Sequence, residues 1–285
     1  MTAHELEITA RALVAPGKGI LAADESHGTI EKRFKGIAVA NTEENRRAYR
    51  DLLFTTPNVV EFISGVILFD ETIRQKGLDG TPFPKLLASR GIIPGIKVDA
   101  GTVALPGRPN EKRTQGLDGL RERLAEDKGL GARFAKWRAV ITIGATGDGL
   151  PSRHCLADNA SALATYAALC QEAGIVPIVE PEVLMDGGHT IERCLEVTEA
   201  TLREVFSALE ERDVVLERML LKPNMVISAK ECKVQAPTLQ VAELTVGCFR
   251  QTVPAAVPGI VFLSGGQTSA QATANLSAMN AMAAV

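Results

Sequence analysis

The chain has 285 residues, of which 46% are hydrophobic and 23% are charged, and its formal net charge at pH 7 is −3. This apolar content can form a sizeable core, which excludes an intrinsically disordered chain. Because 31 basic residues are balanced by 34 acidic ones, there is no overall positive field to hold nucleic acid or an anionic membrane. We therefore expect neither of these partners, and any anion must be bound locally.

The amino-terminal residues lack a basic segment followed by an apolar one, and no stretch approaches the roughly 20 apolar residues that cross a bilayer. The five cysteines are odd in number and lack metal-binding spacing, and the four histidines are scattered. We expect a cytoplasmic protein with reduced thiols, without a metal ion or another cofactor.

Seven short apolar runs are predicted as β-strands, because each is followed by Gly, Pro or charge and then by helical periodicity. They cover residues 19–24, 61–69, 92–98, 137–143, 175–180, 218–224 and 259–264. Amphipathic helices are predicted over residues 156–173 and 190–213, and residues 101–119 are predicted as a long loop. This order of elements indicates parallel strands that are buried on both faces.

Neither a linker nor an internal repeat divides the sequence, so residues 1–285 are predicted to form one domain. No Gly-x-Gly-x-x-Gly motif follows an early strand, which favours a TIM (β/α)8 barrel over a dinucleotide-binding sheet. In a barrel the carboxyl ends of the strands face one mouth. We therefore expect one site from the polar residues at these ends: Asp24, Lys97, Lys136, Glu180, Glu182, Lys222 and Ser264.

A lysine, Lys222, closes the apolar run that begins at Met219. A lysine amine attacks a ketone only in its uncharged form, which neighbouring cations and apolar walls favour. Lys97 and Lys136 stand in comparable places, and three converging cations would both favour the neutral amine and hold anions. Any single lysine of this kind is more often a solvated strand end, so the prediction depends on their convergence.

Glu180 and Glu182 are separated by one residue, so they point to the same face of an extended strand. Two such carboxylates are not both readily ionised. One is expected to have a raised pKa and to act as acid and base, while the other stays ionised beside a lysine. The alternative is that both project into solvent. Ser264 and Gly265 follow another apolar run and form either a phosphate cradle or an ordinary turn.

Several blocks of sequence, in one order along nearly the whole chain, resemble the class I fructose-1,6-bisphosphate aldolases, which form a Schiff base and need no metal. One block is Leu-Leu-Lys-Pro-Asn-Met-Val at residues 220–226, and another is Val-Glu-Pro-Glu at residues 179–182. The others lie at residues 17–26, 41–46, 95–99, 114–120, 134–138 and 262–267. Such an ordered series is more specific than any single motif.

The resemblance implies reversible cleavage of fructose 1,6-bisphosphate to dihydroxyacetone phosphate and glyceraldehyde 3-phosphate, in glycolysis and gluconeogenesis. Lys222 would form the Schiff base and Glu180 would shuttle protons during its formation. Glu182 and Lys136 would hold the amine and the charge, and Asp24 would take the proton of the C4 hydroxyl.

The resemblance also implies the phosphate-binding residues and the assembly. Lys97 and Arg138 would meet the C6 phosphate, and Ser264 with the backbone of Gly265 would meet the C1 phosphate. The same cleft would be bordered by Ser26, Thr29 and Arg33. Members of the family are commonly tetramers, which implies a homotetramer.

The chain departs from the resemblance at its end, where the family's eighth strand, a phosphate-binding arginine and a flexible tail are expected to be missing. Thr142 stands where relatives usually carry a lysine. These departures leave two alternatives open: a noncatalytic sugar-phosphate-binding or scaffold protein inactivated by the loss, and another Schiff-base barrel lyase of the transaldolase kind.

Overall fold

The computed structural model describes residues 3–145 and 147–283, which form two compact units. The first unit comprises Met1–Val98, Asp118–Trp137 and Leu169–Ile178. The second comprises Asp99–Leu117, Arg138–Ala168 and Val179–Val285. Strands β6 (Phe134–Ile141) and β7 (Val176–Val183) begin in the first unit and end in the second. The main sheet has six strands, hydrogen-bonded in the order β1-β2-β3-β6-β7-β8.

The first unit contains parallel strands that pair in the register expected for consecutive βα units. Three of them are β1 (Gly19–Ala23), β2 (Ile63–Leu68) and β3 (Ile93–Lys97), and β3 pairs with the start of β6. The helices of this unit are α1 (Ala3–Leu13), α2 (His27–Lys35), α3 (Glu43–Thr55), α4 (Asp70–Arg74), α5 (Phe83–Ser89) and α6 (Leu120–Leu130), with a 3-10 turn η1 at Val59–Glu61.

The contact between β3 and β6 depends on a glycine. A Cβ atom at Gly95 would lie 2.4 Å from two ring atoms of Phe134, a fully buried residue at the start of β6. The close approach leaves no room for a side chain at position 95. Gly95 therefore allows β3, which ends at Lys97, to pack closely against β6, which carries Lys136, with the ring of Phe134 between them.

A buried carboxyl group in α6 makes the stability of the chain depend on pH. Burial, and to a smaller degree the nearby Asp70, raise the pKa of Asp127 to about 6 from an ordinary value of 3.8. Ionisation is therefore harder in the folded state than in the unfolded state, so the folded chain loses stability as the pH rises from about 4 to about 6. Above that range the loss is complete.

Asp127→Asn is expected to remove this loss and to stabilise the chain by roughly 1–2 kcal/mol at pH 8, with a smaller gain at pH 5. Denaturant unfolding at the two pH values measures the difference. The control is Glu122→Gln at an exposed position of the same helix. Equal gains for Asp127→Asn at both pH values would contradict the explanation.

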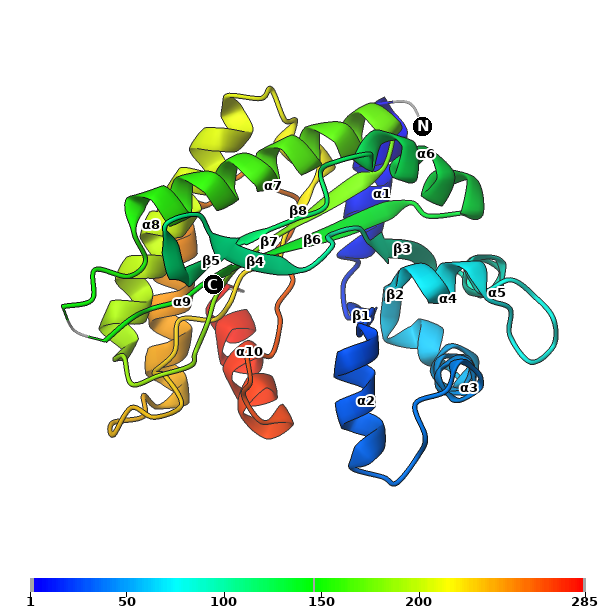
Figure 1. Cartoon of the computed structure of the whole chain (residues 1–285), viewed down its shortest axis with the longest axis horizontal. Coiled ribbons are helices and arrows are strands. Elements are labelled where there is room, and N and C mark those ends of the chain that lie inside the picture. The colour runs from blue at the N-terminus through cyan, green and yellow to red at the C-terminus, as the bar shows by residue number, and fades with distance from the viewer. Residues whose placement is uncertain (1–2, 146, 284–285) are drawn as a thin grey trace. The chain divides into compact units, whose positions relative to one another are not determined.

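The second unit contains the carboxyl-terminal parts of β6 and β7 and a short strand, β8 (Leu220–Leu221), which follows the 3-10 turn η2 (Leu216–Arg218). The second unit also contains a separate antiparallel sheet of two strands, β4 (Thr102–Leu105) and β5 (Arg108–Thr114). Its helices are α8 (Ile191–Glu210), α9 (Thr238–Thr252) and α10 (Ser269–Ala283), and α7 (Arg153–Ala173) begins here and ends in the first unit. Helices α9 and α10 pack against each other (Figure 1).

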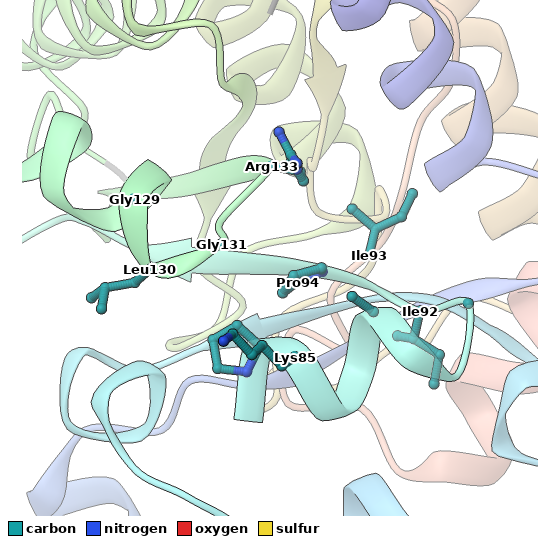
Figure 2. Close-up of a pocket in the computed structure, with 11 residues that line it drawn as sticks. Lys85, Ile92, Ile93, Pro94, Gly129, Leu130, Gly131 and Arg133 are labelled. Carbon is teal, nitrogen blue, oxygen red and sulfur yellow. The ribbon is translucent and has the colours of Figure 1, made fainter. Parts of the chain in front are cut away.

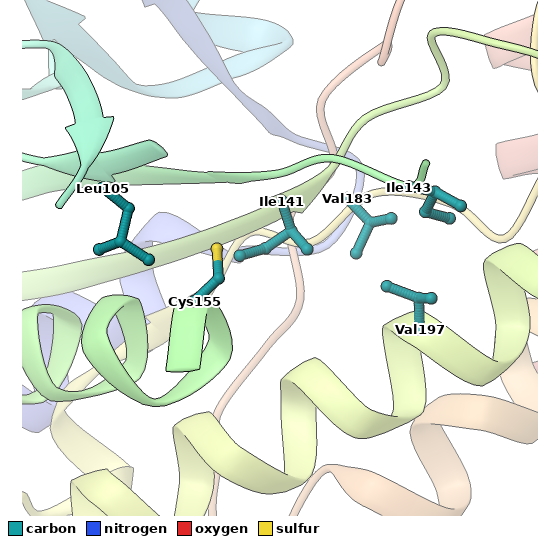
Figure 3. Packing of buried hydrophobic residues seen from close by; sticks show 6 residues of the cluster. All are labelled: Leu105, Ile141, Ile143, Cys155, Val183 and Val197. Atoms are coloured by element: carbon teal, nitrogen blue, oxygen red, sulfur yellow. The ribbon is translucent and has the colours of Figure 1, made fainter. Parts of the chain in front are cut away.

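A buried apolar cluster joins the strand ends of the second unit to its helices. Ile141 and Val183 of β6 and β7 lie beside Cys155 of α7 and Val197 of α8, as Figure 3 shows. Ile143 belongs to the same cluster, so the loop that leaves β6 begins on a rigid base. Helix α8 supports it with an amphipathic face whose ten buried residues include Val197.

Six of the seven predicted strands are present, and both predicted helices are confirmed as α7 and α8. Two expectations are wrong. Residues 101–119 are not a loop, because they contain the β4–β5 hairpin, whose turn is at Pro106 and Gly107. Residues 259–264 are not a strand either. Only Ile260 forms a bridge, to Leu221, so this segment follows β8 through very few hydrogen bonds.

None of the helices in the described part of the chain is long and apolar enough to cross a membrane.

Candidate active site

The first unit holds a buried ion pair between Asp24 and Lys136. Asp24 directly follows β1, and Lys136 is the third residue of β6. Lys136 Nζ lies 2.7 Å from Asp24 Oδ2, with side chains 5% and 12% exposed. Lys136 was expected just before its strand, and it lies within β6 instead. The pair places a carboxylate that can accept a proton beside a fixed positive charge.

Lys97 lies next to this pair along the sheet. It is the last residue of β3 and is opposite Lys136 in the parallel register. Residues at matching positions of adjacent strands leave the sheet on the same face. Both lysines therefore lie on that face, where Lys97 adds a positive charge beside the ion pair of Lys136 and Asp24.

Helix α2 presents Thr29 and Arg33 after its N-cap residue Ser26. The hydroxyl oxygens of Ser26 and Thr29 are 3.2 Å apart, and Arg33 Nη1 lies 2.8 Å from Glu25 Oε1. Glu25 is also paired with the buried Arg50, at 2.7 Å. The spacing of Ser26, Thr29 and Arg33 places them on one side of the helix. Glu25 and Arg50, which the sequence reasoning missed, hold that helix start in place.

The second unit holds a buried pair between Lys222 and Glu180. Lys222 Nζ lies 3.3 Å from Glu180 Oε1, and the side chains are 10% and 4% exposed. The backbone N–H of Lys222 donates to Val179 O at 2.8 Å, which fixes the residue after β8 against β7. An amine and a carboxylate at this distance can exchange a proton, and both are shielded from water.

Glu182 belongs to a different pair from Glu180. Its Oε2 accepts a very short hydrogen bond from Nε of Arg138. Burial raises the pKa of Glu182, against the opposing charges of Arg138 and Lys222 and with the help of Glu180. Burial alone would lower the pKa of Arg138, but Glu182, Glu180 and Asp99 outweigh it and raise that pKa. The pKa of Glu182 is thus raised, and Glu180 is the glutamate paired with the lysine.

Both glutamates lie inside β7, which continues to Val183, so neither projects past the end of a strand. The alternative of two solvated glutamates is thereby wrong: Glu180 and Glu182 are 3% and 6% exposed. Asp99, another residue that the sequence reasoning missed, accepts from the backbone N–H of Arg138 at 3.3 Å. It lies two residues beyond Lys97 in the sequence, which was the signal that could have found it.

Asn224 links the segment of Lys222 to the segment of Glu182. Its Oδ1 accepts from the backbone N–H of Val183 at 3.0 Å, and its Nδ2 donates to Thr198 Oγ1 at 3.1 Å. The residue is 3% exposed. Asn224 lies two positions after Lys222. A polar amide so close to a buried apolar run was the signal in the sequence that could have identified it. The bridge fixes how the two strand ends lie beside each other.

Asn224→Ala is expected to lower the free energy of unfolding by about 2–4 kcal/mol, because it leaves the buried N–H of Val183 and hydroxyl of Thr198 without this partner. Denaturant unfolding measures the loss. The matched control is Asn110→Ala, at an exposed position of β5, which should change stability by less than about 0.5 kcal/mol. A loss for Asn224→Ala no larger than the control's would show that the bridge is not structural.

Ser264 and Gly265 lie in a turn after the single bridge at Ile260. The backbone N–H and the side-chain amide of Gln267 both donate to Ser264 O, at 3.0 and 2.9 Å. Gly265 and Gly266 have φ angles of +59° and +85°, which side-chain-bearing residues rarely adopt. Helix α10 begins shortly afterwards at Ser269. The turn is thus ordered by its own hydrogen bonds, and the side chain of Ser264 lies at an exposed position.

A hollow of about 420 Å³ in the first unit is separate from these residues (Figure 2). Its lining includes Ile93 and Pro94, at the start of β3, and Arg133, just before β6. Lys97 is at the other end of β3. The hollow therefore belongs to the amino ends of the strands, where barrel folds do not carry their active sites.

A buried lysine that follows β8, beside a buried carboxylate on the neighbouring strand β7, is an arrangement that suits Schiff-base chemistry. Comparison with known proteins specifies which of them. A model of the glycolytic family, "Fructose-bisphosphate aldolase class-I", matches residues 5–285. The chain therefore belongs to the class I fructose-bisphosphate aldolase family, whose fold is a TIM-like barrel.

Two relatives from distant organisms carry the name of the same family. A "Probable fructose-bisphosphate aldolase class 1" of Xanthomonas campestris pv. campestris is 63% identical over 280 residues, which are 98% of this chain and 83% of that protein. A "Fructose-bisphosphate aldolase" of Dictyostelium discoideum is 55% identical over 281 residues, 98% of this chain and 78% of that protein.

A solved structure of the same family is also similar to this chain. It is a fructose-bisphosphate aldolase from Plasmodium falciparum, in complex with TRAP and a small-molecule inhibitor. It superposes with a TM-score of 0.96 at 54% sequence identity, and the match covers 98% of this chain and 80% of that one.

Proposed function

We propose that this chain catalyses the reversible cleavage of fructose 1,6-bisphosphate to dihydroxyacetone phosphate and glyceraldehyde 3-phosphate, through a Schiff base on Lys222. The observation that supports this most directly is the pair of Lys222 and Glu180, 3.3 Å apart and buried. The family's glycolytic role agrees with it. The same reaction run in reverse serves gluconeogenesis.

The ammonium group of Lys222 passes one proton to Glu180, and the resulting neutral amine attacks the C2 ketone. A second proton moves from nitrogen to the C2 oxygen, which gives a carbinolamine. Glu180 then returns its proton to that hydroxyl group, which leaves as water. The product is an iminium ion. It draws the electron pair of the C3–C4 bond toward nitrogen, so the bond can break to give an enamine and an aldehyde.

Asp24 is proposed to accept the proton of the C4 hydroxyl as the C3–C4 bond breaks. Its ion pair with Lys136 supports the role, because it holds the carboxylate in place. Glu182 and Lys136 are proposed to balance the charge that develops around the amine. Arg138, bonded to Glu182, links that carboxyl group to phosphate binding.

The phosphate groups are assigned by charge and by exposed backbone. Lys97 and Arg138 are proposed for the C6 phosphate, since each is a cation on a strand of the sheet. Ser264 and the N–H of Gly265 are proposed for the C1 phosphate. The residues proposed to border the substrate are Ser26, Thr29 and Arg33.

We further propose a homotetramer in the cytoplasm, with no domain boundary inside the chain and with the sugar and triose phosphates as its ligands. Relatives in Arabidopsis thaliana and Spinacia oleracea are named cytosolic or cytoplasmic, which supports the location. Analytical ultracentrifugation measures the assembly.

The test combines turnover with trapping. Cleavage of fructose 1,6-bisphosphate is followed through its triose phosphate products, and the same mixture is reduced with borohydride, digested and mapped by mass spectrometry. We expect turnover and a substrate-derived adduct on Lys222. Substrate binding without turnover or adduct would instead indicate a noncatalytic sugar-phosphate-binding protein. A preference for another sugar phosphate would indicate a different Schiff-base lyase.

A further inference from the structure

The side chain of Arg138 is fixed through one nitrogen and free at its end. Its Nε donates to Glu182, whereas neither Nη atom bonds to another group among the described residues. The side chain is 42% exposed. A guanidinium held in this way presents its two terminal nitrogens in one direction, which suits the oxygens of a phosphate group. That direction depends on where the backbone of Arg138 lies.

The backbone of Arg138 is held by side chains on one edge of β6. Strand β3 ends at Lys97, which pairs with Lys136, so Arg138 lies beyond the end of that pairing. The N–H of Arg138 donates to Asp99 Oδ2 at 3.3 Å, and its carbonyl oxygen accepts from the hydroxyl of Thr114 at 2.7 Å. These side chains therefore make the hydrogen bonds that a neighbouring strand would otherwise supply.

Thr114 is the more specific of the two contacts. It is the last residue of β5 and is 6% exposed, and its hydroxyl has this one partner among the described residues. Asp99 also accepts from the N–H of Gly101, at 3.2 Å. Removal of the hydroxyl of Thr114 therefore removes one hydrogen bond to Arg138 and leaves the other contacts in place.

The hairpin that carries Thr114 is anchored to the start of α7. The carboxylate of Glu111, which is 2% exposed, accepts from the N–H and the hydroxyl of Ser152, at 2.6 and 2.7 Å. The side-chain amide of Asn159 donates to Lys112 O at 2.8 Å. The hydroxyl of Thr114 thus reaches Arg138 from a preorganised support.

We propose that Thr114 is a positioning residue for substrate binding: its hydroxyl holds the backbone of Arg138 so that the free end of the guanidinium meets the C6 phosphate. The role rests on the proposed function, in which Arg138 binds that phosphate. Thr114 acts through Arg138 and does not itself touch the substrate. Without the hydrogen bond the strand can shift, and a two-point contact between guanidinium and phosphate tolerates little displacement.

The two phosphates of the substrate give the role a specific signature. Fructose 1,6-bisphosphate carries both of them, whereas dihydroxyacetone phosphate corresponds to the C1 half and has no C6 phosphate. Loss of the positioning contact should therefore weaken binding of the bisphosphate and leave dihydroxyacetone phosphate unaffected. A general disturbance of the fold would weaken both.

Thr114→Val removes the hydroxyl at nearly constant volume. Its KM for fructose 1,6-bisphosphate should rise about five- to tenfold, with kcat within about twofold of the unaltered chain. Calorimetry with hexitol 1,6-bisphosphate, which has no ketone and cannot be cleaved, should show the same weakening. The concentration of dihydroxyacetone phosphate that half-saturates borohydride trapping on Lys222 should change by less than about twofold.

Other variants separate this role from a structural one. Thr114→Ala also lacks the hydroxyl and should repeat the result, whereas Thr114→Ser keeps the hydroxyl and should restore KM. The matched control is Thr102→Val, at the exposed position opposite Thr114 in the hairpin, which should behave as the unaltered chain does. In a chain that carries Arg138→Ala, the addition of Thr114→Val should cause no further loss of affinity. Thermal melting checks that each variant is folded.

Four results would each overturn the positioning role. They are no binding of hexitol 1,6-bisphosphate by the unaltered chain, unchanged affinity in the folded variants without the hydroxyl, an equal weakening for dihydroxyacetone phosphate, and a further loss in the Arg138→Ala chain. Calorimetry also distinguishes this proposal from the cleavage reaction. Affinity for hexitol 1,6-bisphosphate that depends on the hydroxyl of Thr114, without turnover or an adduct on Lys222, would contradict the cleavage reaction alone.

Discussion

Replacement of Lys222 by methionine is expected to abolish the cleavage of fructose 1,6-bisphosphate, with a loss in kcat of roughly 10⁴-fold or more. Methionine has a similar length and no branching, so it can fill the buried space of the lysine but cannot attack a ketone. The amine is removed and the Schiff base cannot form. Steady-state turnover measures the loss, and borohydride trapping should show no adduct at position 222.

The matched control for this change is Lys85→Met, at an exposed position of α5 in the first unit. It should retain turnover, and both variants should melt as folded proteins. Because Lys222 is paired with Glu180, the methionine variant leaves a buried carboxylate without its cation and can be less stable. Substantial turnover by a folded Lys222→Met variant would rule out the proposed nucleophile.

Glu180→Gln is expected to lower kcat by about 10²- to 10⁴-fold, because the amide keeps the shape of the side chain but cannot carry a proton between the amine and the departing hydroxyl. Binding of the substrate should change much less, so KM should stay within about threefold. Steady-state kinetics measures both constants. Rapid-quench trapping should show that imine formation is the slowed step.

Glu196→Gln, an exposed glutamate on α8, is the control for the same chemical change. Its kcat should match that of the unaltered chain. If Glu182→Gln lost more activity than Glu180→Gln and slowed the same step, the proton shuttle would have to be assigned to Glu182, whose pKa is raised by burial. The comparison of the two variants therefore decides between the glutamates.

The sequence was sufficient for the class of fold and for the residue types of the site. Of the seven strands predicted from apolar runs followed by charge, six are present, because a strand buried on both faces must be apolar until its end reaches polar surroundings. Lys222 after such a run predicted an amine in a sheltered position. The spacing of Glu180 and Glu182 predicted two carboxylates on one face, and both lie within β7.

The tertiary structure decided which groups are partners. Lys222 pairs with Glu180, Arg138 with Glu182, and Lys136 with Asp24. In each pair the two residues are 42 or more positions apart in the sequence. A local pattern cannot choose between such pairings, since they depend on strand register. The hairpin at β4 and β5 and the weak pairing near Ile260 were missed for the same reason: hydrogen bonds between segments decide them.

The contrast between the burial of Lys222 and the pairing of Arg138 shows where this limit lies. The sequence by itself determined that a lysine ends a buried run, because burial follows from the apolar residues next to it. It gave no sign that Arg138 bonds to Glu182, because the two side chains come together only when β6 and β7 lie in the folded second unit. Burial of a strand is a local property of the chain, whereas the pairing and enclosure of polar groups depend on contacts between distant segments.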